Sequence, residues 1–506
     1  MADQIGAGRR GKAVERMAGI ELGPREQLRC VIIGAGMAGL LAGIRLKEKG
    51  DQFVIYEKGD KVGGTWRENR YPGLTCDVPA HAYTYSFAPN PEWSQFYAPG
   101  PEIQHYFERI ADDYGIREHI RFGVEVGACR YSEGRWHITL SDGSTDVADV
   151  VIAATGVLHH PKMPDIPGLD SFAGDCFHST RWDDTVPLDG RRIGVIGNGS
   201  TGVQIVSALS ERASRLVHFQ RSPQWIMPVQ NFIYSETDRH AFRSDVSNID
   251  AIRFGQDYWG GIRRFNAAII DADSPEMAEI EAIVLRNLEE SVTDPELREK
   301  LRPSYRAACK RLIYSPNYYA AVQRPNVFIE TGAIERVEPE GVRMRDGTLH
   351  ALDLLVLATG FHADRFVRPM IVTGRDGADL NQAWAVRPTA YYAITIPDFP
   401  NMFLLNGPTA PVGNFSLIDI AERQWAYIDQ LLDLLRQGQC SAIAASHDAL
   451  ADYEERRIAA ARHTIFGSGC TSWYLDAQGV PQTWPWSYDR FAEAMAAPKL
   501  SDFELA

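Results

Sequence analysis

Two segments of the chain show the same order of hydrophobic and polar positions. Residues 28–58 begin with a β-branched apolar run, pass through a glycine-rich turn into a stretch with Leu40 and Ile44 on one face, and end in a second apolar run. A short apolar run predicts a buried strand, and apolar residues three to four positions apart predict a helix. Residues 191–222 repeat this order, so the sequence predicts two strand–helix–strand units.

Helix signals replace strand signals between about residues 228 and 305. Ser274 is of a type that caps helices, Pro275 suits the first helical position, and the apolar residues that follow have the spacing of one helix face. Asp294 predicts a second helix start of the same kind. We interpret this stretch as a helical insertion, after which strand-like runs return and an αβ segment from about residue 385 closes the chain.

The composition is that of an ordinary folded protein. The chain has 506 residues, of which 45% are hydrophobic and 23% charged, so it is long enough for several domains with buried cores. Its formal net charge of -14 repels phosphate backbones and anionic headgroups, which argues against nucleic acid and membrane surfaces as partners. No apolar run approaches the ~20 residues of a membrane span. Residues 1–27 form a polar arm that we expect to be mobile and that lacks a signal-peptide core, so we expect a cytoplasmic protein.

The seven cysteines show no pattern typical of a redox or metal centre. They include no CxxC pair and no His/Cys cluster at metal-ligand spacing, so no metal site is predicted. We interpret them as reduced thiols, several of them buried. This interpretation argues against a flavin disulfide reductase, which needs a close redox-active pair.

Gly34, Gly36 and Gly39 form a GxGxxG turn between a predicted strand and a predicted helix. In such a turn the glycines allow a tight bend, close approach of a pyrophosphate and packing of helix against strand, while the helix N-terminus attracts the negative charge. Glu57 follows at the end of the next strand, 57 − 34 = 23 positions on. This is close to the ~20-residue offset at which a carboxylate binds a ribose, so the sequence predicts a dinucleotide site here.

Gly197, Gly199 and Gly202 form a second GxGxxG turn in the same context. At the matching offset, 221 − 197 = 24, the chain has Arg221 followed by Ser222. A carboxylate at this position would repel a 2′-phosphate, whereas a guanidinium binds it through charge-assisted hydrogen bonds. The second site is therefore predicted to prefer NADP(H) to NAD(H), and the two sites together predict FAD and NADPH as cofactors.

The order of these elements predicts an α/β fold with two Rossmann-like dinucleotide-binding domains, for FAD and for NADP, and a helical insertion in the second. The expected segments are 28–155 for the first part of the FAD-binding domain, 156–384 for the NADP-binding domain with its insertion at about 228–305, and 385–506 for the second part of the FAD-binding domain.

Two further motifs identify a family. Residues 63–77 have the sequence GGTWRENRYPGLTCD, and the connector at 172–183 has the sequence FAGDCFHSTRWD, which contains His178 and Trp182. Together with the two GxGxxG turns, these motifs resemble the signatures of the type I Baeyer–Villiger monooxygenases. The related flavin-containing monooxygenases that oxygenate nitrogen and sulfur typically carry a different aromatic residue at the position of Trp182. The connector lies between the two predicted domains, where we expect it to couple their motions.

The resemblance implies roles that the residue pattern alone leaves unassigned. Lys310 is expected to hold the 2′-phosphate of NADP, and Arg311 is expected to enter the active site over the flavin. Asp77 corresponds to the carboxylate that positions this arginine, so Arg311 and Asp77 are the expected catalytic residues. Further cofactor-binding residues are expected at Thr65, Trp66, Asp77 and Tyr83, at Ser200, Thr201, Gln204 and Ser222, and at Trp473, which lies between Ser472 and Tyr474 near the nicotinamide ribose.

The resemblance also implies a reaction. NADPH would reduce FAD, and a flavin peroxide formed with dioxygen would convert a ketone to an ester or lactone while Arg311 stabilises the negative charge. Three alternatives stay open: a flavin monooxygenase that oxygenates nitrogen or sulfur, an NADPH oxidase that releases hydrogen peroxide, and a nucleotide-binding or redox-sensing protein without catalysis. The stretches at 410–416 and after Trp473 differ from the better-known ketone monooxygenases, so the sequence does not predict which ketone is used.

Overall fold

The computed structural model of the chain describes residues 27–411 and 415–506. Residues 1–26 of the polar arm that we expected to be mobile lie outside the described residues. In the part of the chain that the structure describes, no helix is long and apolar enough to cross a membrane.

A five-stranded parallel sheet organises the first half of the fold. Its strand order is β19-β7-β1-β2-β3, and every pairing in it is parallel. The strands are β1 (Arg29–Ile33), β2 (Gln52–Glu57), β3 (Ile120–Phe122), β7 (Val150–Ala153) and β19 (Met402–Leu404). Because β19 pairs with β7, this sheet joins the beginning of the chain to its final quarter.

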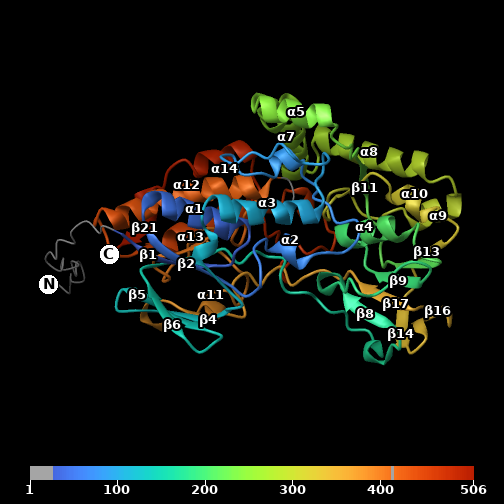
Figure 1. Cartoon of the computed structure of the whole chain (residues 1–506), viewed down its shortest axis with the longest axis horizontal. Helices are drawn as coiled ribbons and strands as arrows, with labels where there is room; N and C mark the ends of the chain where they lie inside the picture. Colours follow the sequence, from blue (N-terminus) through green and yellow to red (C-terminus); the bar gives the residue numbers. More distant parts are fainter. Residues whose placement is uncertain (1–26, 412–414) are drawn as a thin grey trace, which may run out of the picture.

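A second five-stranded parallel sheet repeats the arrangement with the order β13-β10-β9-β17-β8. Its strands are β8 (Asp175–His178), β9 (Arg192–Ile196), β10 (Arg215–Phe219), β13 (Val327–Glu330) and β17 (Leu354–Leu357). Figure 1 shows the two sheets side by side along the long axis of the molecule. The fold is therefore α/β with two Rossmann-like units, as the sequence predicts.

The edge strand β8 corrects one interpretation of the sequence. Residues 172–183 were predicted to be a connector, yet Asp175–His178 pair in parallel with β17. The segment has no strand period because only four residues pair and because, as an edge strand, it has no neighbour on its other side. The Trp182 side chain after it is 5% exposed and packs edge-to-face on Phe177.

The helices after the two glycine turns are α1 (Met37–Lys49) and α4 (Ser200–Leu209). Helix α1 packs against β2, against α3 (Gly100–Asp113) and against α12 (Leu417–Arg436). Its apolar residues, including the predicted Leu40 and Ile44, are buried in a core that continues into the second sheet. Both predicted strand–helix–strand units are confirmed.

Two smaller sheets flank the large ones. One has the order β18-β4-β5-β6, and the other is β14-β15-β16. Their strands are β4 (Val126–Ser132), β5 (Arg135–Leu140), β6 (Thr145–Ala148), β14 (Ile334–Glu338), β15 (Gly341–Met344), β16 (Leu349–Ala351) and β18 (Ile371–Thr373). Strand β18 pairs with β4 of the first unit, although the predicted boundary at residue 384 places it in the second.

Five helices lie between β11 (Ile226–Pro228) and β12 (Ile313–Ser315). They are α5 (Glu236–Ser244), α6 (Ser247–Phe254), α7 (Gln256–Ile270), α8 (Pro275–Ser291) and α9 (Pro295–Lys300). The Ser274 side chain accepts a hydrogen bond from the amide of Met277, so the predicted cap is confirmed. Strands β11 and β12 pair with each other, so this helical segment begins and ends at the same place.

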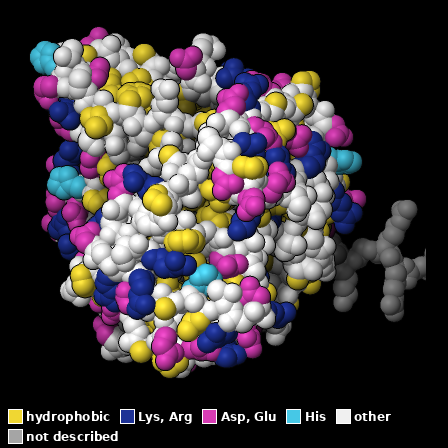
Figure 2. Space-filling model, turned by 90° about the vertical axis from the view of Figure 1, so that its right-hand side faces the viewer, with side chains coloured by type: hydrophobic (Ala, Val, Ile, Leu, Met, Phe, Trp, Pro, Cys, Tyr) yellow, Lys and Arg dark blue, Asp and Glu magenta, His cyan; other side chains and the backbone are white. Residues whose placement is uncertain are grey.

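The exposed face at the β13 and β16 end of the molecule carries mixed charges. Figure 2 shows Lys and Arg side chains interspersed with Asp and Glu over this face. Exposed ion pairs such as Arg192–Asp353 and Arg336–Glu335 belong to this part of the fold. Opposite charges therefore lie in close pairs on this face.

A partly buried ion cluster holds α12 against the first sheet. Asp51, at the start of β2, has a side chain that is 2% exposed and bonds to Arg436 at 2.7 Å. Its other oxygen accepts the backbone amide of Leu28 at 3.0 Å. Arg436 also pairs with Asp429 and Asp433. Lys49 on α1 pairs with Asp429 and Asp433 as well, so two cations compensate the three carboxylates, and Arg436 ties α12 to the first βαβ unit.

We expect Arg436→Met to lower the free energy of unfolding by about 3 kcal/mol, because it leaves the buried Asp51 carboxylate without its cation. Urea unfolding of the variant and the parent protein measures the difference. Arg212→Met is the control, since Arg212 pairs with Asp189 on the surface and should cost no more than about 1 kcal/mol. Equal effects of the two substitutions would contradict a structural role for the cluster.

Candidate active site

The first glycine turn has the backbone that a dinucleotide site requires. Gly34 has φ +101°, and a Cβ there would lie 2.7 Å from the carbonyl oxygen of Ala154. A Cβ on Gly39 would lie 1.8 Å from the oxygen of Gly34, so the helix and the turn pack without room for a side chain. Gly36 faces the backbone of Gly64 in the predicted 63–77 motif. The turn can therefore approach a ligand through its backbone alone.

The start of α1 is open to an anion, because no side chain caps its first amide groups. No side chain caps Gly36, and the first turn of α1 contains no acidic residue. The Glu57 carboxylate lies at the end of β2 and accepts the amides of Ala35 and Gly59, each at 2.7 Å. Its oxygens keep further lone pairs for ribose hydroxyls. An uncapped helix start beside this carboxylate fits the pyrophosphate and ribose of FAD.

Trp66 and Tyr83 lie together beside this turn. The Trp66 indole donates to the Tyr83 hydroxyl at 3.2 Å, and both side chains are less than 10% exposed. Burial raises the pKa of the Tyr83 phenol, so the group stays neutral. Thr65 opens the short helix α2 (Thr65–Glu68) and is exposed. The structure therefore groups Trp66 with Tyr83 in the interior and leaves Thr65 at the surface.

The second glycine turn has the same geometry and a histidine beneath it. A Cβ on Gly197 would lie 2.2 Å from the oxygen of Ala358, whereas a Cβ on Gly199 would meet no atom within 4 Å. The fully buried His218 contacts the Gly197 carbonyl oxygen at 3.0 Å through Nε2 and the Tyr318 hydroxyl at 3.1 Å through Nδ1. Burial lowers the pKa of His218 to about 4, so the ring is neutral at pH 7.

Two predicted cofactor residues on α4 contact the other half of the molecule. Thr201 and Gln204 bond to the Tyr71 hydroxyl at 3.3 and 2.9 Å. Gln204 also donates to the backbone oxygen of Thr75 at 3.0 Å. The structure thus brings both residues to the 63–77 motif, where they join the two units, while Ser200 stays at the first position of α4.

Lys310 and Arg221 gather near Ser222 at the end of β10. The Lys310 ammonium donates to the Ser222 hydroxyl at 3.0 Å and lies 4.2 Å from the centre of the Tyr305 ring. Partial burial, and then the charge of Arg221, lower the pKa of Lys310. Neither cation has an ion-pair partner among the described residues. Two neighbouring cations without a carboxylate fit a 2′-phosphate.

Arg311 and Asp77 form an ion pair although 234 positions separate them along the chain. Arg311 Nη2 lies 2.5 Å from Asp77 Oδ2, and the two side chains are 28% and 25% exposed. Burial by itself would lower the pKa of Arg311, but the Asp77 carboxylate and the Tyr474 phenol raise it above its ordinary range. Arg311 is therefore a permanent cation and no acid or base.

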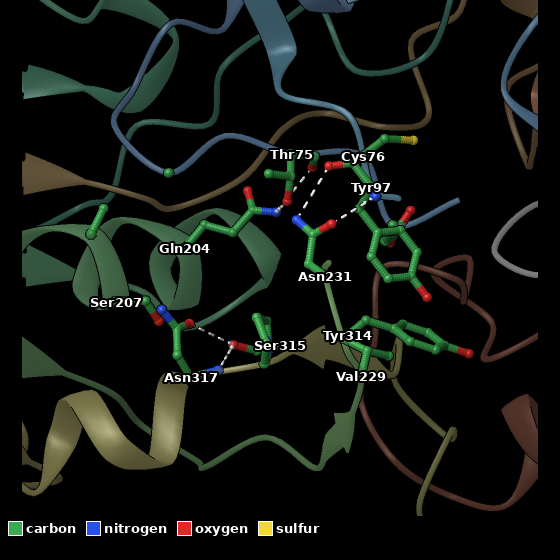
Figure 3. Close-up of a pocket in the computed structure, with 14 residues that line it drawn as sticks. Thr75, Cys76, Tyr97, Gln204, Ser207, Val229, Asn231, Tyr314, Ser315 and Asn317 are labelled. Atoms are coloured by element: carbon green, nitrogen blue, oxygen red, sulfur yellow. Dashed lines mark hydrogen bonds between the residues drawn. The ribbon is translucent and has the colours of Figure 1, made fainter. Parts of the chain in front are cut away.

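A cavity of about 210 Å³ reaches Asp77 from the side of α4. Figure 3 shows Gln204 directed toward Thr75, and Tyr97 and Tyr314 lining the other side of the cavity. Asn231 holds the backbone of Tyr97 through bonds of 2.8 and 3.3 Å. The sequence did not single out Tyr97, Asn231 or Tyr314, although Tyr314 lies three positions after Arg311 and could have been sought there.

One prediction about the cysteines is wrong. Cys309 and Cys470 form a disulfide with 6.2 Å between their Cα atoms, whereas both were interpreted as reduced thiols. The two residues are 161 positions apart, so their spacing carried no information about pairing. The disulfide joins the segment that leads to Lys310 and Arg311 to the loop of Trp473. Trp473 itself is 45% exposed and stacks on Tyr474.

The chain is similar to known flavin-dependent monooxygenases over most of its length. The family model described as flavin-binding monooxygenase-like matches residues 27–235. A Baeyer–Villiger monooxygenase of Streptomyces coelicolor is 38% identical over 489 residues, which cover 95% of this chain and 93% of the relative. An uncharacterised monooxygenase of Mycobacterium tuberculosis is 43% identical over 452 residues, 89% of this chain and 90% of the relative.

Solved structures show the same likeness. The structure of cyclohexanone monooxygenase from Rhodococcus sp. Phi1 bound to NADP+ is 30% identical, with a TM-score of 0.85 over 96% of this chain and 99% of that one. The OTEMO complex with FAD and NADP is 27% identical, with a TM-score of 0.85 over 96% of this chain and 100% of that one.

Arg221→Ala is expected to raise the KM for NADPH about tenfold, because one charge-assisted hydrogen bond to a phosphate is lost. NADH lacks this phosphate, so steady-state kinetics with NADH should give an unchanged kcat/KM and serve as the internal control. An equal loss with both cofactors would contradict a phosphate-binding role for Arg221.

We expect His218 to make the folded protein less stable as the pH falls from about 6.5 toward about 4. The unfolded chain takes up a proton in this window and the folded chain does not, which amounts to about 2 kcal/mol by pH 5. In His218→Gln this contribution is absent, so the stability gap to the parent protein should narrow between pH 7 and pH 5. A gap that stays constant in urea unfolding at the two pH values would argue against it.

Proposed function

The chain belongs to the Baeyer–Villiger monooxygenase family, and we propose that Arg311 and Asp77 form the centre at which a ketone is oxygenated. The protein is an FAD-containing monooxygenase that depends on NADPH and dioxygen. The observation that carries the proposal is the 2.5 Å contact between the two side chains at the junction of the two nucleotide-binding units.

Bound FAD, reduced by NADPH, supplies the chemistry that activates dioxygen. In the overall reaction, ketone, NADPH, dioxygen and a proton give ester or lactone, NADP+ and water. The residues of the chain contribute a positive charge and hold it in position. Since the neighbours of Arg311 raise its pKa, the guanidinium keeps its charge. It would stabilise the negative charge that develops on the carbonyl oxygen of the substrate, a preorganised electrostatic effect.

Asp77 would hold the guanidinium in place. Its carboxylate belongs to the loop after α2, and this loop is fixed to α4 by Gln204. A Cβ on Gly73 in the same loop would lie 2.7 Å from the Gln204 backbone oxygen, so loop and helix are in close contact. We infer that the domain junction, and not a flexible surface loop, sets the position of Asp77.

Cofactor binding is proposed for the two glycine turns. Gly34, Gly36 and Gly39 with Glu57 would hold FAD, with Trp66 and Tyr83 beside it, in a domain built from 28–155 and 385–506. Gly197, Gly199 and Gly202 with Ser200 would hold the pyrophosphate of NADPH, and Arg221, Ser222 and Lys310 its 2′-phosphate, in a domain at 156–384. The geometry that supports this proposal is the uncapped start of each helix and the pair of neighbouring cations, Arg221 and Lys310, which have no carboxylate partner among the described residues.

The substrate is proposed to be a ketone. Structures of cyclohexanone monooxygenase have been solved with cyclohexanone and with ε-caprolactone, the corresponding lactone. Ring ketones are therefore the first compounds to test on this chain. The cytoplasmic location stays a prediction from the sequence.

Arg311→Ala is expected to lower ester formation at least a hundredfold while NADPH still reduces the flavin, since the lost group acts only on developing charge. Anaerobic stopped-flow measures flavin reduction, and mass spectrometry of aerobic reactions measures the ester. Arg456→Ala on α13 (His447–Ala461) is the control, because Arg456 is exposed and, within residues 27–411 and 415–506, its side chain bonds only to the Asp452 backbone oxygen. Normal ester yield from Arg311→Ala would exclude the proposed role.

A further inference from the structure

Residues 468–473 form a short loop with few hydrogen bonds to the rest of the fold. The loop follows the 3-10 helix η6 (Ile465–Gly467), which packs against α7. Within the described parts of the chain, 27–411 and 415–506, the hydrogen bonds of this loop run only to residues 465–475. The disulfide from Cys470 to Cys309 is therefore the bond that ties the loop to a distant segment.

The Cys309 end of the disulfide is held by contacts of its own. Cys309 is 1% exposed and lies in an apolar cluster that includes residues of α7 and α8. Four positions earlier, the backbone oxygen of Tyr305 accepts the Trp225 indole at 2.7 Å. Breaking the disulfide would therefore leave Cys309 in place and remove the anchor of the loop at 468–473.

The disulfide can be reached through its other sulfur. Cys470 is partly exposed, and its neighbours Gly469 and Thr471 are exposed. Exchange begins when a thiolate attacks one sulfur of a disulfide, and access limits its rate. A dithiol would attack Cys470 Sγ and release Cys309 Sγ, and its second sulfur would then displace Cys470. One disulfide breaks and one forms in the reductant, while two electrons and two protons pass to the two cysteines.

The residues next to the two cysteines are both expected at the coenzyme. Lys310 follows Cys309 directly and is expected to hold the 2′-phosphate of NADP, and its ammonium donates to Ser222 at 3.0 Å. Trp473 stands three positions after Cys470 and is expected near the nicotinamide ribose. With 6.2 Å between the Cα atoms of the cysteines, the disulfide keeps these two parts of the chain together. Holding a binding loop in place before the ligand arrives raises affinity.

We propose that Cys309–Cys470 is a site of thiol–disulfide exchange with a dithiol, and that its redox state controls the affinity for NADPH. The intact bond holds the loop against the segment of Lys310, and reduction frees the loop and weakens coenzyme binding. The cytoplasmic location predicted from the sequence would expose the bond to thiol reductants, a setting in which disulfides are usually catalytic or redox-sensing. The effect on affinity rests on the proposed NADPH site.

The redox dependence is tested on the FAD-loaded full chain without any substitution. Samples are equilibrated with oxidised or reduced dithiothreitol, alkylation and peptide mass spectrometry give the state of both cysteines, and calorimetric titration gives the Kd for NADP+. We expect the Kd to rise about fivefold on reduction, because the loop is no longer held in place. Equal Kd values in the two states, or failure of the bond to form under oxidising conditions, would overturn the proposal.

Cys470→Ser identifies the responsible bond. This variant should bind NADP+ with the affinity of the reduced protein and should not respond to dithiothreitol. Cys176→Ser is the matched control, since Cys176 is a free and exposed cysteine, and it should keep the full response. A response lost in Cys176→Ser and kept in Cys470→Ser would assign the effect to another thiol and overturn the proposal.

A second readout needs neither coenzyme nor activity. Trp473 is 45% exposed, so chymotrypsin cleavage after it, followed by mass spectrometry, reports how freely the loop moves. Cleavage should become severalfold faster on reduction and in Cys470→Ser, and an unchanged rate would contradict release of the loop. Redox-dependent NADP+ affinity in a protein that makes no ester from any ketone would overturn the proposed function and support the exchange site. Ester formation with an affinity that ignores the dithiol would do the reverse.

Discussion

The ion pair between Asp77 and Arg311 is the constraint on which the candidate site depends. One member comes from a loop of the first unit, and the other comes from the end of the helical segment in the second. Because Asp77 needs its loop and the loop needs α4 through Gln204, the pair is held only when the two units are in contact. The ion pair is therefore part of the contact between the two units, and its geometry depends on how the units pack against each other.

The glycine turns and the residues at a fixed offset from them could be predicted from the sequence, because they depend on contacts within one short segment of the chain. A GxGxxG turn requires glycines wherever backbone approaches backbone, and the close contacts of Gly39 and Gly202 show this at both turns. The offset from each turn to Glu57 or Arg221 is the length of one helix and one strand, which a pattern can count. Arg311 and Asp77 could be paired only through family resemblance, because 234 positions lie between them.

The features that the sequence missed are made by contacts between distant segments. Cys309 pairs with Cys470 across 161 positions, and no local pattern marks either residue. Strand β8 gains its structure from β17, and β18 gains its structure from β4 across the predicted boundary. Tyr97 and Asn231 reach the cavity because separate loops meet there. In each case the conformation of a segment depends on a contact with a distant part of the chain, which a local sequence pattern does not reveal.

The pairing of β11 with β12 has a consequence for how this architecture can diversify. The segment of five helices begins after β11 and ends before β12, and the pairing of these two strands holds its two ends next to each other. Lengthening or replacing the helices would leave Lys310 and Arg311, just before β12, where they are, because closing a longer loop between fixed ends costs little. The helices can therefore change while Lys310 and Arg311 keep their positions. The helical segment can thus vary in length and sequence without disturbing the sheet that holds its two ends.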